Sequence, residues 1–175
     1  MKYVLVKNDI VRAKKVSPQE GYIEAPDDVK IGSAYDGVDF YAPPSPYHAW
    51  DGSNWVLDNQ QKHDALQQSL ADYRWQQETD AITINSKPVP TDRHSQIKWQ
   101  QQKEKSENDS TYSVRWKMAD GQFYSLDASE IISIADAVAT HVDNCFAVED
   151  TVQQEIQNDQ HTTEQQVQTR FEELL

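Results

Sequence analysis

The sequence predicts an α+β protein: a small β-rich N-terminal part, a connecting helix, then short helices, a β-hairpin and a long C-terminal helix. Short apolar runs separated by turn residues fill the first 58 residues, and the stretch from Asn59 to Glu78 contains neither Gly nor Pro. From Ala128 onward, apolar residues recur at helical spacing. We therefore divide the chain into a β-rich domain over residues 1–58, a connecting helix over 59–80 and an α+β domain over 81–175.

Turn residues organise the first domain. Asn8-Asp9 separates the apolar strand Tyr3–Val6 from its returning partner, and Asp36-Gly37 and Asp51-Gly52 indicate two further hairpins. Three prolines within residues 43–46 predict an extended stretch between these hairpins.

The connecting helix is predicted from Leu66, Leu70 and Tyr73, which fall at i, i+4 and i+7. Either Asp58 or Asn59 serves as its N-cap, since both side chains can accept backbone hydrogen bonds there.

Short elements follow the connecting helix. We expect a strand at Ala81–Ile84 and a turn over residues 85–88. A second helix, capped by Thr91 or Asp92, should run through Gln101 with Ile97 on its buried side.

The C-terminal half begins with a polar loop at Glu104–Ser110 and a hairpin that pairs Tyr112–Trp116 with Gln122–Leu126. The longest helix starts at Asp127 and reaches Gln157, and a last short helix starts at Thr162 or Thr163.

The long helix carries a two-position apolar seam with alternating steps of three and four, interrupted by Glu149. The seam consists of Ala128, Ile131, Ala135, Val138, Val142, Cys145, Glu149, Val152 and Ile156. A third row at Ile132, Ala139 and Phe146 favours internal packing over Ala128–Phe146, whereas a subunit interface and internal packing both remain open beyond Glu149. Val138, Val142, Val152 and Ile156 are therefore candidate contact residues, and we expect a homo-oligomer, with a trimer favoured.

Composition excludes several classes of function. The 29 acidic and 16 basic residues give a formal charge of −13, which argues against nucleic acid because phosphate binding needs clustered Lys and Arg. Cys145 is the single cysteine, so an internal disulfide is excluded. The apolar runs are too short for a signal peptide or a membrane span, so we expect synthesis in a cytoplasm and no membrane contact.

No catalytic or metal-binding constellation is expected. His94 and Ser95 are adjacent and point about 100° apart on a helix, and the five histidines lack i, i+4 pairing. The five glycines are isolated, so no phosphate-binding loop is present. We predict no catalytic residue, metal or cofactor, and assign Thr91, Asp92, Arg93 and Gln96 to a structural motif at the start of the second helix.

An aromatic group in the first domain is a candidate binding surface. Tyr41, Tyr47 and Trp50 lie on predicted turns beside prolines, where aromatic side chains anchor protein contacts or stack on sugars. The alternative is that these rings, with Trp55, form the core of a domain that has little other apolar mass. Both alternatives remain open for Trp50, and the core is favoured for Trp55.

Several segments carry a family resemblance. Tyr73–Thr79, Ile82–Ile84 and Pro90–Gln96, followed by Val114–Gly121, Leu126–Ala128 and the long helix, resemble a domain of unknown function common in phage tail and tail-fibre proteins. That resemblance covers about residues 70–175. Upstream, Pro43–Val56 is similar to a stretch of tail-fibre assembly proteins, within about residues 35–58.

The resemblance implies a non-enzymatic accessory protein of a phage tail or tail fibre, with fibre or baseplate proteins as partners. It would reside in the virion tail, and in the host cytoplasm during assembly. Two alternatives remain open: a fibre-assembly chaperone that leaves the particle, and a host-glycan-binding module that uses Trp50 and Tyr47.

Overall fold

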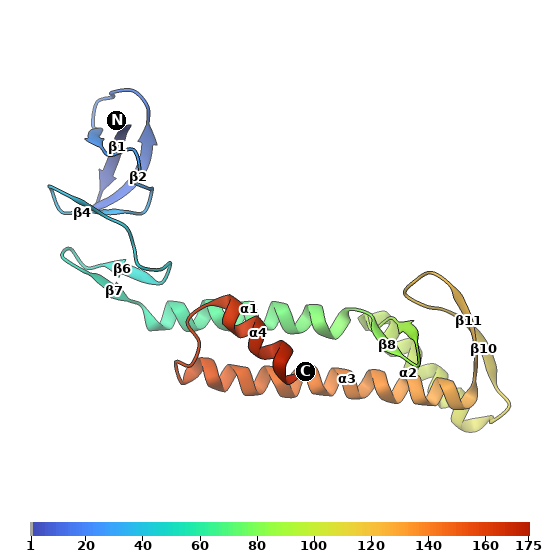
Figure 1. The fold of residues 1–175 in the computed structure, drawn as a ribbon. Coiled ribbons are helices and arrows are strands. Elements are labelled where there is room, and N and C mark those ends of the chain that lie inside the picture. The colour runs from blue at the N-terminus through green and yellow to red at the C-terminus, as the bar shows by residue number, and fades with distance from the viewer. Residues whose placement is uncertain (1) are drawn as a thin grey trace. The chain divides into compact units, whose positions relative to one another are not determined.

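A computed structural model describes residues 2–175 and has the predicted α+β architecture (Figure 1). The chain divides into two compact units at Lys62 and His63. This division lies inside the first helix, four residues beyond the boundary expected from composition.

Unit 1 contains an antiparallel sheet with strand order β3-β1-β2-β4-β5, and a separate hairpin β6-β7. Its strands are β1 (Lys2–Lys7), β2 (Ile10–Lys15), β3 (Ile23–Ala25), β4 (Ala34–Tyr35), β5 (Phe40–Tyr41), β6 (His48–Trp50) and β7 (Trp55–Leu57). Its core is small, with Val4, Val11, Ala25 and Val29 buried.

The predicted turns of unit 1 are confirmed. Asn8 and Asp9 both adopt positive φ, at 50° and 58°, which suits the two-residue turn of the β1-β2 hairpin. The Asp36 carboxylate accepts hydrogen bonds from the amides of Val38 (2.8 Å) and Asp39 (2.9 Å). Asp51 plays the same part in the β6-β7 turn.

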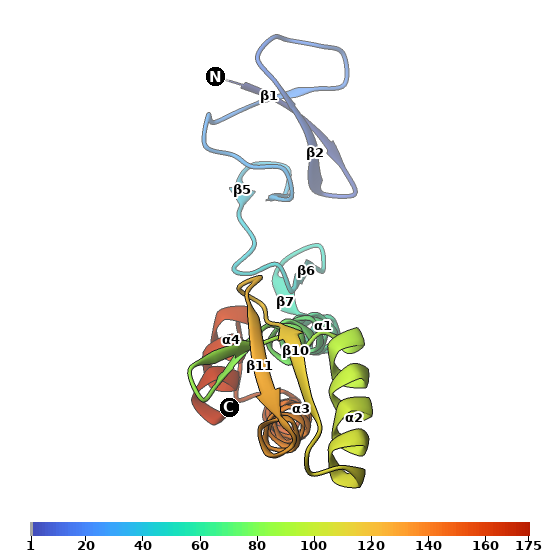
Figure 2. The ribbon, with the colours of Figure 1, turned by 90° about the vertical axis from the view of Figure 1, so that its right-hand side faces the viewer.

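Unit 2 is built on two long helices that lie side by side (Figures 1 and 2). Viewed along them, α2 lies on one side and α4 on the other (Figure 2). The elements are α1 (Asn59–Thr79), β8 (Ile82–Ile84), β9 (Lys87–Val89), α2 (Arg93–Asn108), β10 (Ser113–Lys117), β11 (Phe123–Asp127), α3 (Ala128–Gln157) and α4 (Glu164–Leu174).

The starts of the helices agree with the sequence. Asp127 and Glu130 form a capping box at α3, and Thr163 and Gln166 form another at α4. The Asp58 carboxylate accepts from the Gln61 amide at 2.9 Å, which satisfies one free donor of α1.

Two hydrophobic clusters lie along α3. The first half of α3 packs with α2 and both hairpins of unit 2, through Val89, Trp99, Met118, Leu126, Ile131, Ile134, Ala135 and Val138. The second half packs with α1 and α4, through Leu66, Leu70, Cys145, Val148, Val152, Ile156, Val167 and Phe171.

Three local expectations around α2 are wrong. The helix continues to Asn108, so residues 104–108 are helical and not a loop. Ile97 is 56 % exposed, and Trp99 is buried instead, packed on Trp116 with ring centroids 4.5 Å apart. Residues 87–89 form a strand, because Asn85 and Ser86 take positive φ and complete the hairpin turn earlier.

Among the described residues, α3 is long and apolar enough to cross a membrane by length and composition, although the sequence led us to expect no such segment. Its apolar stripe contributes to both hydrophobic clusters of unit 2. Of the most apolar 18-residue stretch of α3, 33 % is buried inside the chain.

Candidate interaction surfaces

The α3 seam is used inside the chain, which corrects our expectation for three of the four candidate contact residues. Val138 is 3 % exposed, and Val152 and Ile156 are fully buried in the two clusters of unit 2. Along the second half of α3, α1 and α4 cover the seam that a second subunit's helix would cover in a coiled coil. Val142 is partly exposed and remains accessible to a partner.

The aromatic group of unit 1 forms a short stack. Tyr41 lies parallel to Trp50 with ring centroids 5.7 Å apart, and Trp55 meets Trp50 edge-on at 5.5 Å. The indole nitrogens of both tryptophans are buried without a hydrogen-bond partner among the described residues. Trp50 is therefore mainly a packing residue, while Tyr41 is 39 % exposed and presents the outer ring.

Tyr47 lies on the turn that precedes β6. Its amide donates to the Ser45 hydroxyl at 3.2 Å, and the side chain is partly buried. The same hydroxyl is 2.8 Å from Nδ1 of His48. The His48 amide also donates to the Ser45 carbonyl at 3.3 Å, so both Ser–His contacts lie within this turn.

The structural motif at the start of α2 is confirmed for Thr91, Asp92 and Gln96. The Asp92 carboxylate accepts from the amides of His94 (3.0 Å) and Ser95 (3.1 Å) and from the Ser95 hydroxyl. The pKa of Asp92 is lowered, mainly because the Ser95 hydroxyl donates a hydrogen bond to its carboxylate. Because Ser95 donates to Asp92, it is not poised to react with His94.

The neighbours of Asp92 close the corner between α1 and α2. The hydroxyl of buried Thr91 donates to the carbonyl of Asp80. The Gln96 amide donates to the Thr91 carbonyl at 2.8 Å and reaches Glu78 at 3.3 Å. Arg93, the fourth residue assigned to this motif, is exposed.

A polar layer separates the two hydrophobic clusters. Arg74 on α1 bonds to Glu78, which is 4 % exposed, and to Glu149 on α3 at 3.1 Å. His141 lies 2.9 Å from the carbonyl of Gln77 and 3.7 Å from the Cys145 sulfur. Glu149, which interrupts the apolar seam in the sequence, is therefore the α3 partner of Arg74.

Two exposed aromatic rings flank Arg74. Its guanidinium lies 4.6 Å from the ring centroid of Phe146 and 5.9 Å from that of Trp75. Phe146 is 49 % exposed and Trp75 is 43 % exposed. This edge-of-helix aromatic pair was not predicted as a surface, because Arg74 and Phe146 lie far apart in the sequence.

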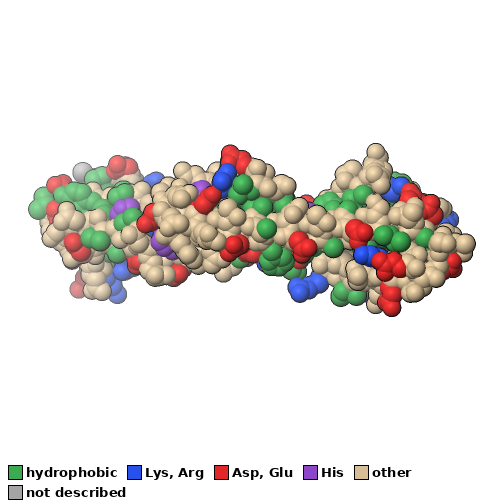
Figure 3. Space-filling model, turned by 90° about the horizontal axis from the view of Figure 1, so that it is seen from below, with side chains coloured by type: hydrophobic (Ala, Val, Ile, Leu, Met, Phe, Trp, Pro, Cys, Tyr) green, Lys and Arg blue, Asp and Glu red, His purple; other side chains and the backbone are tan. Residues whose placement is uncertain are grey.

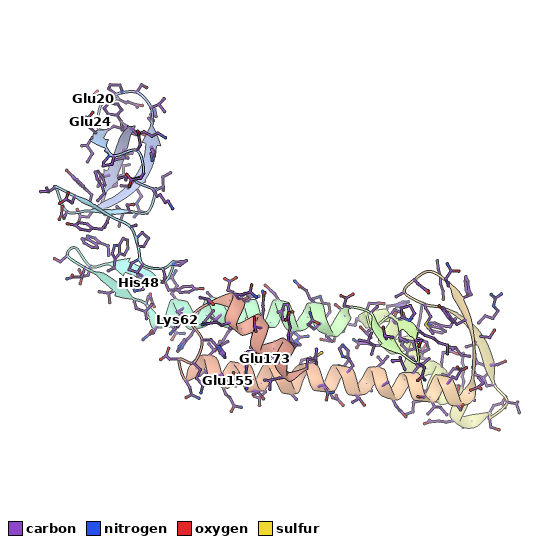
Figure 4. The ribbon with its side chains drawn as sticks, viewed as in Figure 1. Glu20, Glu24, His48, Lys62, Glu155 and Glu173 are labelled. Atoms are coloured by element: carbon purple, nitrogen blue, oxygen red, sulfur yellow. The ribbon has the colours of Figure 1, made fainter. Side chains whose placement is uncertain are left out.

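A second ionic group joins α3 to α4. Glu155 accepts a bidentate contact from Arg170, with Nε and Nη2 at 3.1 and 3.0 Å from Oε1, and lies 2.8 Å from His161. Figure 4 labels Glu155 on α3 and Glu173 on α4, which also contacts Arg170 at 3.3 Å. The hydrogen bonds from Arg170 lower the pKa of Glu155 most, and the contact with His161 lowers it further. Burial alone would raise this pKa.

The described residues contain no group of three His, Cys, Asp or Glu side chains arranged to hold a metal ion. On the face shown in Figure 3, hydrophobic side chains lie in small groups among polar and acidic ones. The surface chemistry on this face is thus distributed and not gathered at one site.

Comparison with known proteins identifies one family. A family described as "Domain of unknown function (DUF4376)" matches residues 55–171, which is more than half of the chain and includes α1 to α3 and most of α4. No curated protein and no solved structure matches the chain.

Proposed function

The chain belongs to the family of the domain of unknown function DUF4376, and we propose that it is a non-enzymatic accessory protein of a bacteriophage tail or tail fibre. It acts through protein–protein contacts, either with itself or with fibre or baseplate proteins. It resides in the virion tail, after assembly in the host cytoplasm.

The main support for this proposal is the structural role of the side chains in the motif segments. The segments that resemble phage tail proteins contribute Arg74, Glu78, Thr91 and Gln96, and these side chains bond to one another, to Glu149 or to backbone carbonyls. Residues that hold a helix corner together leave little polar chemistry for a substrate. A motif whose side chains maintain the shape of the fold suits a structural component that acts through its surfaces.

The surface chemistry agrees with a contact role. Large apolar side chains remain exposed on several elements of unit 2, including Trp75, Ile97, Phe123 and Phe146. Aromatic side chains that are held rigidly at a surface are frequent anchors of protein interfaces.

The proposal is tested by quantitative mass spectrometry of purified particles of the phage that encodes the chain. A fixed number of copies per particle, near a multiple of the tail symmetry, is the expected result. In addition, particles grown without the gene should fail to attach their tails or their fibres. Normal, infectious particles that neither contain nor need the chain would refute a tail function.

The same measurement separates the structural role from a chaperone role. A chaperone would be missing from purified particles but would co-purify with a fibre protein from infected cells. For glycan binding the structure offers less, because Tyr41 covers one face of Trp50 and Trp55 meets it edge-on. A sugar stack would have to use Tyr41 or Tyr47.

A further inference from the structure

The charge of unit 2 is divided between two segments. Residues 93–117, which include α2 and β10, contain six basic and three acidic residues. Residues 118–175, which include α3 and α4, contain twelve acidic residues and one basic residue, Arg170. One segment of the chain is thus electrostatically complementary to the other.

The basic segment presents an exposed helix face. α2 turns Trp99 and Ser106 inward and leaves Arg93, Ile97, Lys98 and Lys105 exposed, and its exposed acidic residues are Glu104 and Glu107. We call Arg93, Ile97, Lys98 and Lys105 the α2 outer face. An isoleucine that is 56 % exposed among three cations provides an apolar contact with a charged rim.

The acidic segment presents a matching apolar surface on α3. A hollow of about 210 Å³ is lined by Ala135, Val138, Ala139 and Val142, with Gln96 and Asp143 at its border. Phe146 follows one turn after Val142 and is half exposed. We call Ala139, Val142, Asp143 and Phe146 the α3 waist, since they lie between the two hydrophobic clusters.

The charge around the α3 waist is acidic. Arg74 is the cation beside Phe146, and its contacts with Glu78 and Glu149 leave that group with a net negative charge. Asp143 and Asp150 are exposed on the same helix. The occupant that fits this surface is therefore an apolar side chain surrounded by basic ones.

We propose that the α2 outer face of one copy of the chain docks on the α3 waist of a second copy. The same chain carries both surfaces, and α2 packs directly on α3. Two copies can therefore form a closed dimer in which the α2 outer face of each copy contacts the α3 waist of the other. The inference rests on the self-association included in the proposed function and assigns it to residues. It does not depend on the identity of any tail protein.

Light scattering of the full chain during size-exclusion chromatography tests this docking. At low ionic strength the wild type should have at least twice the single-chain mass of 20.1 kDa. The variants R93E/K98E and D143K/D150K should each have a dissociation constant raised more than about tenfold, because like charges would then face each other. An equimolar mixture of the two variants should regain the wild-type mass.

The variant K7E/K30E is the matched control for R93E/K98E, because it makes the same charge change at exposed positions of unit 1. It should associate like the wild type, and circular dichroism should show all variants folded. A wild type that remains at the single-chain mass at low salt overturns the inference. Wild-type association in both reversal variants, or a mixture that stays dissociated, overturns it as well. Mass spectrometry of virions tests the proposed tail function separately, so failure of the docking can be distinguished from failure of the tail function.

Discussion

Cys145 lies in the apolar cluster between α1 and α3, where solvent does not reach it. Burial, reinforced by the nearby charge of Glu78, raises the pKa of its thiol to about 11. At pH 8 only about a thousandth of such a thiol is ionised. We expect a thiol reagent to label the native chain very slowly and to label it at once in denaturing urea. Rapid labelling of the native chain would show that this cluster opens readily.

Glu155 makes the stability of the fold depend on pH. Its folded pKa is lowered, chiefly by Arg170, so its contribution to stability is present above the ordinary Glu pKa of about 4.3 and is lost as the pH falls through the lower folded value. We expect R170Q to lower stability at pH 7, by a small amount because Arg170 is exposed to solvent. The difference between R170Q and wild type should shrink below pH 4. Urea denaturation at several pH values measures it, and a difference that grows toward low pH would contradict this account.

At the scale of elements, α4 is held to the α1–α3 pair by one large side chain. Phe171 is fully buried and meets the ring of Tyr73 edge-on at 5.6 Å. F171A should reduce the free energy of unfolding by about 3–5 kcal/mol, because it leaves a cavity between three helices. L174A on the same helix is the control: Leu174 is 38 % exposed, so the expected change is within about 0.5 kcal/mol. Equal losses for both variants would show that α4 is not docked through Phe171.

Local signals predicted most elements because they act within a few residues. The Asn8-Asp9 turn, the Asp127 cap and the 3.6-residue period of α3 each depend on neighbours along the chain. The choice of Trp99 over Ile97 as the buried residue of α2 depends instead on Trp116 and on the Pro90 carbonyl, which accepts from the indole at 3.1 Å. Sequence periodicity does not contain that information.

The candidate surfaces were harder to predict for the same reason. The α3 seam indicated a helix partner correctly, but its spacing is the same whether the partner is another subunit or α1 and α4 of the same chain. The Arg74 group joins residues 74 and 149, and only the fold brings them together. Val142 is the apolar seam residue that remains partly exposed, because it lies at the level of the polar layer and not within either cluster.

At the scale of the whole molecule, the two units have cores of different size. Four buried residues form the cluster of unit 1, whereas each cluster of unit 2 contains eight. Because stability follows the apolar area buried, unit 1 should open at a lower free energy than unit 2. Hydrogen exchange should therefore be faster in β1–β5 than in α2 and α3.

A variant in the smaller core tests whether the units open independently. V11A removes two methyl groups from a fully buried position and should cost roughly 2 kcal/mol, nearly all of it in unit 1. Exchange should accelerate at the amides of β1 and β2, while those of α2 and α3 keep their wild-type protection. The matched variant V152A, which changes the same residue type in α3, should show the reverse pattern. If V11A instead accelerates exchange equally in both units, the chain opens as one cooperative body, and the smaller core of unit 1 is stabilised by unit 2.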